Sequence, residues 1–368
     1  MAPLPLDVLQ ALIDALVSQG LFGTLATVTA CDRALFTFGI PRLYGTVHLT
    51  HGNASRVFAG LLLPDLPPAT LPPPTGALWP DQPLPLRAEA APPPRSDSTY
   101  PSQISHQRKM HCLSYTKQLV IGTIPSHGVS NQLKVMQRAP GQYSLFPNVQ
   151  LAHLTSRCVW MLADWHNAHS TPDSLATHPF TAFLMSSIRP VRVIVDYPTF
   201  NPRRRHEWWH ARFGPHELFP TAEQEQQRKN SLQSWWRTFV RRGISRPFLG
   251  ILLRIKPEVV VLRNIVGSRG MAVPGARTIA LHAKCQCRQH GKDDPRHCSD
   301  HVTPAERVKN VVDMCIKAEG MSTEQFKCTV ELTGLELAVD EQQRTMHKAI
   351  KDALSDKGIG KKVTVKFM

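Results

Sequence analysis

The sequence lacks the features that would direct the chain to a membrane or out of the cell. No Lys or Arg precedes Arg33, and Asp7 and Asp14 interrupt the first apolar run. A secretory signal needs early positive charge and an uninterrupted apolar stretch, and a transit peptide is rich in Arg and poor in acidic residues, so we expect neither. No window of about 18 uncharged apolar residues occurs, so we expect no membrane span. The apolar opening segment is therefore expected to belong to the folded protein.

The sequence also lacks the short motifs of common enzyme classes. It contains no G-x-S-x-G, no protein-kinase motif set and no G-x-G-x-x-G. The stretch GTIPSHGVSN, residues 122–131, follows an expected strand but has neither a dinucleotide-binding nor a Walker pattern. These absences favour a protein that is not an enzyme and that needs no cofactor.

The length of the chain and its prolines suggest how it is divided. Its 368 residues allow two or three hydrophobic cores at roughly 150 residues each. Of its 31 prolines, 13 lie between Pro64 and Pro101. No helical or alternating pattern survives there, and such a composition buries too little apolar surface to offset the entropy of ordering. We predict a disordered, polyproline-like insert over residues 64–104.

Charge and cysteine content bear on partners and compartment. The net charge of +15 is regional, because much of it falls between Arg203 and Arg254. It fits an acidic partner such as nucleic acid, or simply a basic face. The eight cysteines are scattered along the chain, and without a signal peptide reduced thiols are favoured. We expect a cytoplasmic or nuclear protein.

The segment PLPLDVLQALIDAL, residues 3–16, predicts the first helix. Its apolar positions form one stripe at helical spacing, made of Leu6, Leu9, Ile13 and Leu16. Pro5 suits the first turn of this helix and Gly20 suits its C-cap. Two further short helices are expected through residues 21–28 and 33–41. Three short helices form a small core, so leftover apolar surface would pack on a partner or on the rest of the chain.

These first residues resemble the F-box of fungal F-box-like proteins. The resemblance is carried by Leu4, Pro5, Asp7, Val8, Leu9, Ile13, Leu16, Leu21, Leu25, Val28, Cys31, Arg33, Leu35, Pro41, Leu43, Tyr44, Val47 and Leu49. It covers about residues 3–50 and implies a three-helix F-box-like domain over residues 1–50. The chain departs from the family pattern at Gly23 and Gly39, where helix formers are expected and each Gly weakens a helix by up to roughly 1 kcal/mol relative to Ala.

The resemblance also implies a partner. An F-box docks on a Skp-family adaptor of a cullin-based ubiquitin ligase. The residues that would present the adaptor-facing apolar surface are Leu4, Pro5, Val8, Leu9, Ile13, Leu16, Leu25 and Val28. The alternative is a helical cap on the downstream domain that binds no partner.

Beyond the insert, short β-branched runs alternate with helical patterns. The expected strands are residues 117–124, 149–155, 191–197, 258–265, 277–283, 326–332 and 361–367, and the expected helices are 156–165, 177–187, 222–243, 304–319 and 340–356. This alternation favours an α/β domain with a parallel sheet. A doubly wound sheet and an irregular leucine-rich-repeat-like solenoid both fit. SLFPNVQLAHLT and PEVVVLRNI resemble strand starts in fungal F-box-like proteins, so we favour the solenoid for residues 105–368.

Three segments suggest other chemistry. In HEWWH, residues 206–210, His206 and His210 lie on one helical face and Glu207 could activate a zinc-bound water, so a zinc-dependent hydrolase is one alternative. Residues 285–301 hold six Cys and His side chains, but at irregular spacing, so a polar loop is favoured over a metal site. In the basic segment 228–246 the aromatic stripe and the arginines lie on different faces, which favours a packed helix over a nucleic-acid site.

The function favoured by the sequence is substrate recognition in an SCF-type ubiquitin ligase, without catalysis. The chain would bind a Skp-family adaptor and its cullin complex through the F-box and a protein substrate through the C-terminal domain. It would act by raising the local concentration of the substrate near a ubiquitin-charged enzyme. We assign no catalytic or metal-binding residue, and expect neither nucleic acid nor a membrane as partner. A zinc-dependent hydrolase and a basic nucleic-acid-binding protein are the alternatives.

Overall fold

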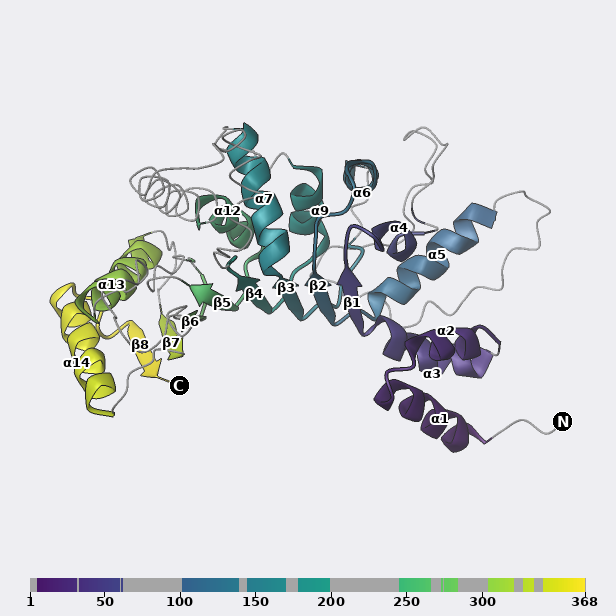
Figure 1. Cartoon of the computed structure of the whole chain (residues 1–368), viewed down its shortest axis with the longest axis horizontal. Coiled ribbons are helices and arrows are strands. Elements are labelled where there is room, and N and C mark those ends of the chain that lie inside the picture. The colour runs from purple at the N-terminus through teal and green to yellow at the C-terminus, as the bar shows by residue number, and fades with distance from the viewer. Residues whose placement is uncertain are drawn as a thin grey trace, which may run out of the picture. The chain divides into compact units, whose positions relative to one another are not determined.

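The computed structural model describes residues 5–31, 33–59, 61, 101–138, 144–169, 178–198, 245–265, 273, 275–283, 304–320, 327–333 and 340–367 (Figure 1). Within them the chain is α/β, with helices at the N-terminus followed by a sheet of eight strands. The strands follow one another in the sheet in chain order, from β1 to β8. The predicted α/β class with a parallel sheet is confirmed.

The elements have the following bounds. The strands are β1 (Thr46–Leu49), β2 (Gln118–Ile121), β3 (Leu151–Leu154), β4 (Arg192–Asp196), β5 (Val259–Ile265), β6 (Thr278–Ala283), β7 (Cys328–Thr333) and β8 (Val363–Phe367). The helices are α1 (Leu6–Ser18), α2 (Phe22–Cys31), α3 (Arg33–Tyr44), α4 (Ala54–Val57), α5 (Pro101–Ser114), α6 (His127–Arg138), α7 (Ser156–His169), α9 (Pro179–Ser187), α12 (Ser245–Ile255), α13 (Pro304–Gly320) and α14 (Asp340–Asp356).

The chain forms two compact units. Unit 1 is Met1–Leu154, Thr177–Val193 and Ile255–Pro257, and unit 2 is Thr155–Ala176, Ile194–Arg254 and Glu258–Met368. Strand β4 begins in unit 1, where the Arg192 N–H donates to the Gln150 carbonyl at 2.9 Å. Just after β4, in unit 2, the Tyr197 N–H donates to the Arg263 carbonyl at 2.9 Å.

The sheet of unit 1 carries its core on one face. Strands β1, β2 and β3 pair in parallel, with Val47 opposite Leu119 and Leu119 opposite Ala152. These three residues are buried, and helices α4, α6 and α9 lie on one side of the strands (Figure 1). The core between helices and sheet includes an aromatic cluster in which the Phe58 ring contacts Phe146 and Phe183 edge-on, with centroids 6.2 and 5.8 Å apart. Burial of these large rings anchors α4 and α9 to the unit.

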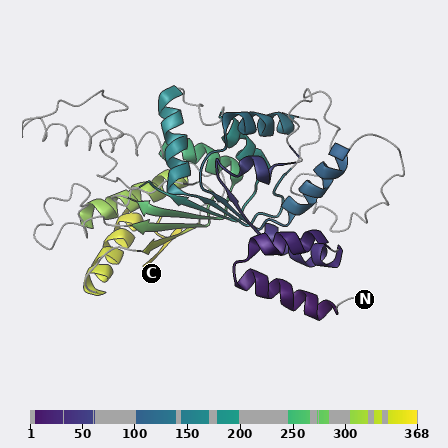
Figure 2. The ribbon, with the colours of Figure 1, turned by 45° about the vertical axis from the view of Figure 1, so that its right-hand side comes forward.

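The N-terminal helical block consists of α1, α2 and α3, which pack on one another (Figure 2). Helix α1 ends in a Schellman motif: the Leu21 N–H donates to the Leu16 carbonyl at 2.9 Å, and the Gly20 N–H to the Val17 carbonyl at 3.0 Å. Gly20 has a φ of +69°, which explains the glycine there. Gly20 thus lies one residue beyond the C-cap, Gln19, and Pro5 is the N-cap instead of part of the first turn.

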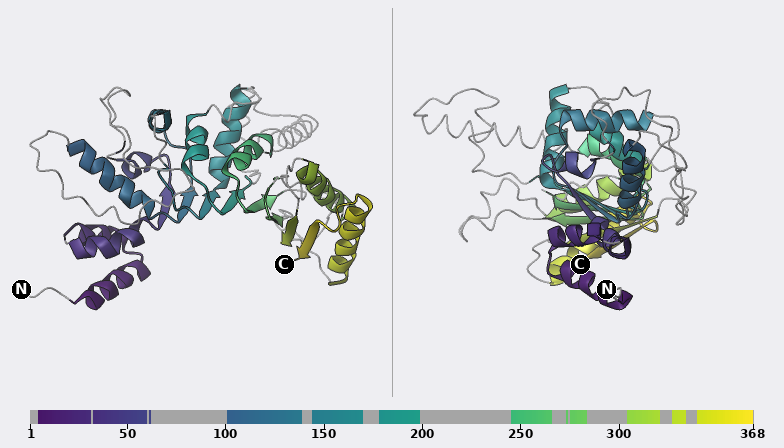
Figure 3. Two further views of the ribbon diagram at one scale, coloured as in Figure 1. Left: turned by 180° about the vertical axis from the view of Figure 1, so that it is seen from behind. Right: turned by 90° about the vertical axis from the view of Figure 1, so that its right-hand side faces the viewer.

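Unit 2 repeats the parallel pairing in β5 to β8. Val260, Ile279, Val330 and Val365 lie opposite one another in register on successive strands. Helices α13 and α14 lie beside β7 and β8 (Figure 3). Helix α14 ends in the same motif as α1, because the Ile359 N–H donates to the Leu354 carbonyl at 3.0 Å and the Gly358 N–H to the Ser355 carbonyl at 2.9 Å.

The structure differs from the sequence prediction at several elements. Helix α5 begins at Pro101, so the last four residues of the range predicted as insert, 101–104, are helical, with Pro at the first helical position. Helices α6 and α12 were not expected. The predicted helix 222–243 and most of the predicted insert lie outside the described residues. In the described part of the chain, no helix is both long enough and apolar enough to cross a membrane.

Candidate functional site

Helix α1 has two apolar faces. Leu9 and Ile13 are buried against α2 and α3, with Ile13 only 1% exposed. A second set of apolar residues, spaced i, i+3, i+4 and i+7, is exposed to solvent: Val8, Ala11, Leu12 and Ala15. We call this set the exposed apolar face of α1. A surface helix normally has a single apolar stripe, so the second apolar face leaves only a narrow polar strip on α1.

Apolar exposure is concentrated in this part of the molecule. Among the described residues seven large hydrophobic side chains are exposed, and five of them lie between residues 6 and 22: Leu6 (61%), Phe22 (50%), Val8 (46%), Leu21 (44%) and Leu12 (43%). Scattered exposed apolar residues are ordinary, but a concentration in one short stretch marks an interaction surface. Helices α1 and α2 therefore present the strongest candidate site of the described residues.

The residues predicted to face a partner divide into three groups. Pro5 and Val8 are exposed, Leu16 and Val28 are half-buried, and Leu9, Ile13 and Leu25 are buried inside the helical block; Leu4 lies outside the described residues. The buried three hold the block together and can reach a partner only if the block opens. The set predicted to face a partner did not include the exposed Leu12, Leu21 and Phe22, although Leu21 is among the residues that carry the resemblance. Leu12 could have been found, because the spacing 8, 11, 12, 15 forms a second helical stripe.

The electrostatic character of this surface is close to neutral. Helix α1 carries only Asp7 and Asp14 as charged residues, and α2 carries none. Arg42 on α3 donates to the Asp14 carboxylate from Nε and Nη2, both at 3.3 Å, so one of the two charges is paired. A partner would thus be held by apolar contact and not by charge.

The crossing of α2 and α3 depends on Gly39. A Cβ placed on Gly39 would come within 1.9 Å of Thr29 Cγ2, because Thr29 is buried against α3 at this point. The residue that departs from the F-box pattern therefore allows the two helices to approach closely, and its helix-weakening effect is offset by packing. Gly23, the other departure, has open space around its Cα. The two glycines thus have different structural roles.

The four buried thiols among the described residues offer no second site. Burial raises the pKa of Cys158, Cys315 and Cys328 to about 12, with the neighbouring Cys328 adding to the shift of Cys315. Burial also raises the pKa of Cys112, partly opposed by Lys109. Thiols that stay protonated at neutral pH are poor nucleophiles and poor metal ligands.

The alternative chemical sites cannot be built from the described part of the chain. Residues 206–210, 228–246 and 285–301 all lie outside it, apart from the last two residues of 228–246. Among the described side chains there is no group of three or more Cys, His, Asp or Glu that could hold a metal ion.

Comparisons with family models, with curated proteins and with solved structures gave no match to this chain. What defines the site is therefore its own geometry: a three-helix block with a buried stripe, a separate exposed apolar face, and a parallel α/β sheet following it in the chain.

Proposed function

We propose that this protein is a substrate-recognition adaptor of an SCF-type ubiquitin ligase. One observation carries the proposal: five of the seven exposed large hydrophobic side chains among the described residues lie between residues 6 and 22, within the segment that resembles an F-box. Surface of this kind is costly to leave in water, at roughly 25 cal/mol per Å² of apolar area. A Skp-family adaptor that covers it would gain that free energy on binding.

The sheet supports a second part of the proposal. Strands β2 to β8 lie within residues 105–368 and follow one another in chain order, with described helices between most of them, an arrangement that is compatible with a leucine-rich-repeat-like solenoid. We propose such a solenoid for residues 105–368, with a protein substrate bound to it. The ligase would then act through proximity, because holding the substrate near a charged enzyme raises its effective concentration. We place the protein in the cytoplasm or the nucleus.

The experiment is a binding measurement with the full-length protein and a purified Skp-family adaptor. The variant Val8→Asp with Leu12→Asp puts two charges on the exposed apolar face without touching the buried stripe. We expect affinity to fall at least about a hundredfold, since the two side chains lie in the apolar centre of the surface. Leu9 and Ile13 are unsuitable targets because they are buried and their replacement would unfold the block.

The matched control is Val191→Asp, which adds a charge at a side chain that is 50% exposed but lies elsewhere in unit 1. It should bind the adaptor as the wild type does. If the unmodified protein fails to bind any Skp-family adaptor at micromolar concentration, or if the double variant binds equally well, the proposal is wrong.

A further inference from the structure

In the described part of the chain the sheet has two edge strands, β1 and β8. On its outer side, an edge strand presents main-chain N–H and C=O groups with which another extended chain can pair. Native proteins either cover such groups or use them to bind a partner strand. The two edges of this sheet differ in what meets these groups.

At the β1 edge, a side chain occupies outward main-chain groups. The Gly122 N–H donates to the Leu49 carbonyl at 2.8 Å, so Leu49 is directed towards β2 and its neighbours His48 and Thr50 are directed outwards. Asn53 Nδ2 donates to the His48 carbonyl at 2.7 Å, and Asn53 Oδ1 accepts from the Thr50 N–H at 2.7 Å. The carboxamide of Asn53 thus pairs with groups that would otherwise be open to an added strand.

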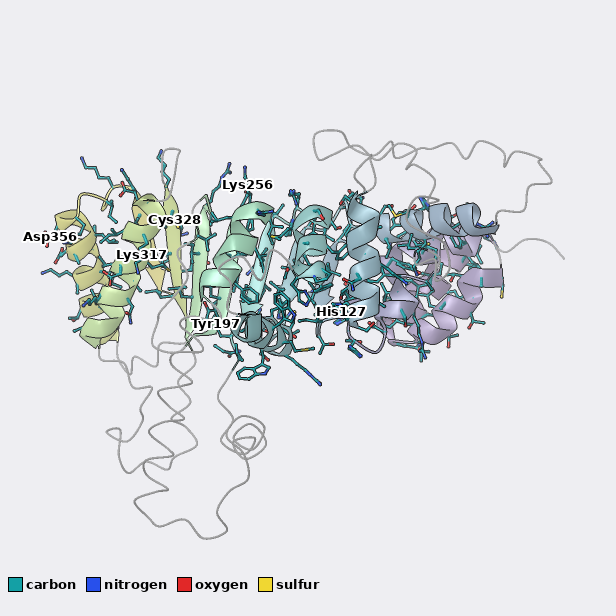
Figure 4. All side chains as sticks on the ribbon, turned by 90° about the horizontal axis from the view of Figure 1, so that it is seen from above. His127, Tyr197, Lys256, Lys317, Cys328 and Asp356 are labelled. Atoms are coloured by element: carbon teal, nitrogen blue, oxygen red, sulfur yellow. The ribbon has the colours of Figure 1, made fainter. Side chains whose placement is uncertain are left out.

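At the β8 edge, the outward groups have no such partner. Cys328 lies on β7, next to β8, and its N–H donates to the Lys362 carbonyl at 3.0 Å (Figure 4). Because the direction of the main-chain groups alternates along a strand, Thr364 also directs its N–H and C=O to β7. Val363 and Val365 direct theirs outwards, and no hydrogen bond from a described residue reaches these outward groups.

The side chains at β8 also leave room for one more strand. Ile279, Val330 and Val365 lie opposite one another on successive strands, and the first two are buried whereas Val365 is partly exposed. On the other face of β8, Thr364 and Lys366 are exposed. Since side chains alternate between the two faces of a sheet, an added strand would place apolar residues beside Val365 and polar ones beside Lys366.

The lysines of β8 indicate which polar residues would fit. Residues 357–367 follow Asp356 and contain four exposed lysines and no acidic residue, although one of these lysines, Lys362, is held in an ion pair. Lys366 lies opposite Glu331 of β7 on its inner side, and no described strand lies on its outer side. An acidic side chain is the favourable cross-strand neighbour for a lysine, and a basic one is unfavourable.

We propose that β8 binds an extended segment of another protein as an added strand, in which apolar residues alternate with acidic ones. The main chain of that segment hydrogen-bonds to the outward groups of Val363 and Val365 and supplies affinity. Its apolar side chains cover Val365, and an acidic side chain lies beside Lys366 and supplies specificity. The surface belongs to unit 2 and does not depend on adaptor binding by α1, so either proposal can fail alone.

A second copy of this chain fits the β8 edge less well. Antiparallel pairing of β8 with β8 would bring lysines of the two copies opposite or diagonal to one another, which is unfavourable. Pairing of β8 with β1 of a second copy would have to displace the Asn53 side chain from His48 and Thr50. The partner that matches the edge is therefore a different polypeptide.

The test measures the binding of two fluorescent peptides of about nine residues to the full-length protein by anisotropy. One peptide alternates glutamate with valine, and the other alternates lysine with valine. We expect the glutamate peptide to bind at least about tenfold more tightly, because the lysine peptide places like charges beside the lysines of β8.

Two variants test the contact itself. Val365→Pro removes an outward N–H but no donor to β7, and should weaken binding of the glutamate peptide at least about fivefold. Lys366→Thr keeps a good strand former and should weaken binding about threefold. The matched control is Lys327→Thr, which removes an exposed lysine just before β7 and away from the β8 edge, and should bind as the wild type does. Thermal unfolding checks that the variants fold.

Hydrogen exchange measured by NMR locates the bound peptide. The glutamate peptide should slow exchange of the Val365 amide and leave that of the Thr364 amide, which already points to β7, unchanged. If Val365→Pro does not fold, Lys366→Thr and the exchange rates decide. The proposal is overturned if neither peptide binds, if both bind equally, if the folded variants bind as the wild type does, or if the Val365 amide is not protected. Sedimentation without peptide tests the second copy: a dimer that Val365→Pro abolishes would overturn the proposal and assign the edge to self-association.

Discussion

Helices α1 and α14 are built alike and are exposed in opposite ways. Both end in a Schellman motif on a glycine with positive φ, +69° at Gly20 and +74° at Gly358. Both bury one stripe of aliphatic side chains in the unit that contains them. What they leave in water differs: α1 exposes large apolar side chains, whereas α14 exposes none and instead exposes charged side chains of both signs. The buried stripe thus shows how a helix packs within its unit, whereas only the exposed face indicates what the helix could bind.

The largest effect should separate the two apolar faces of α1. Ile13→Asp would place a carboxylate at a side chain that is 1% exposed, and we expect the free energy of unfolding of unit 1 to fall by at least about 3 kcal/mol. Val8→Asp, on the exposed face of the same helix, should change it by less than about 0.5 kcal/mol. Urea denaturation followed by circular dichroism measures both.

The same pair can be made in α14, with Ile350→Asp as the buried change and Lys351→Gln as the exposed one. Ile350 has no exposed surface, so a large loss is expected there and almost none at Lys351. If the change at Val8 or Lys351 lowered the free energy of unfolding as much as the change at the buried residue of the same helix, the assignment of buried and exposed faces in that helix would be wrong.

Alkaline pH should distinguish the C-terminal region from the helical block. The thiols of Cys315 and Cys328 have a pKa raised from 9.0 to about 12 by burial. In the unfolded chain they ionise above pH 9, whereas in the folded chain they stay protonated to about pH 12. Their contribution to stability is therefore complete below pH 9 and is lost between pH 9 and pH 12, and by pH 10 each thiol should cost about 1.4 kcal/mol.

The measurement is urea denaturation at pH 8 and pH 10. Cys315→Ala with Cys328→Ala should show a smaller difference between the two pH values than the wild type does. Cys31, which is exposed in the helical block, provides the control Cys31→Ala, and this variant should keep the full pH difference. An unchanged difference in the double variant would show that other groups cause the loss.

A smaller effect should mark the close crossing in the helical block. Gly39→Ala would force Thr29 aside, at a cost of roughly 1 to 3 kcal/mol. Gly23→Ala meets no atom within 4 Å and should stabilise α2 by up to about 1 kcal/mol, because Ala is the better helix former. Opposite signs in thermal unfolding support the packing role of Gly39, and equal signs would refute it.

The two capping glycines should behave alike. Gly20→Ala and Gly358→Ala each place a Cβ in the left-handed region, at a cost of about 1 kcal/mol. Since a Cβ added at either position would meet no atom within 4 Å, no steric clash should separate the two variants. Denaturation of the two variants tests this, and a difference greater than about 1 kcal/mol would mean that the two helix ends are not equivalent.

The smallest effects are expected for two ion pairs near the surface, one in the helical block and one in unit 2. Asp14→Asn removes the pair with Arg42, and Glu319→Gln removes the pair with Lys362. Both pairs are largely solvated, so each change should cost less than about 1 kcal/mol, and the cost should shrink in 0.5 M salt. A larger loss that persists in salt would show that the contact does more than pair two charges.

The parts of the fold that could be predicted are those where local pattern and burial agree. The β-branched runs at β4, β5 and β6 and the helices α13 and α14 were found within a few residues of their ends. Helix α6 was missed because it is mostly polar and buries only Ser130 and Leu133 among its described side chains. Helix α12 was missed because no element was predicted between the expected helix 222–243 and the expected strand 258–265.

At the candidate site, the sequence could give the stripes of α1 but not their surroundings. The spacing of Leu9, Ile13 and Leu16 shows that these residues share a face. It does not show that α2 and α3 cover that face, since this depends on contacts between segments that lie apart in the chain. For the same reason, the close approach of Thr29 to Gly39 had no signature in the sequence.

The division into units has a practical consequence for anyone who wishes to take the molecule apart. The chain passes from one unit to the other five times, after Leu154, Ala176, Val193, Arg254 and Pro257. No single cut therefore releases either unit whole, because every cut divides at least one of the two units. Point substitutions keep both units intact and can therefore test the role of one unit, whereas truncation cannot isolate either unit whole.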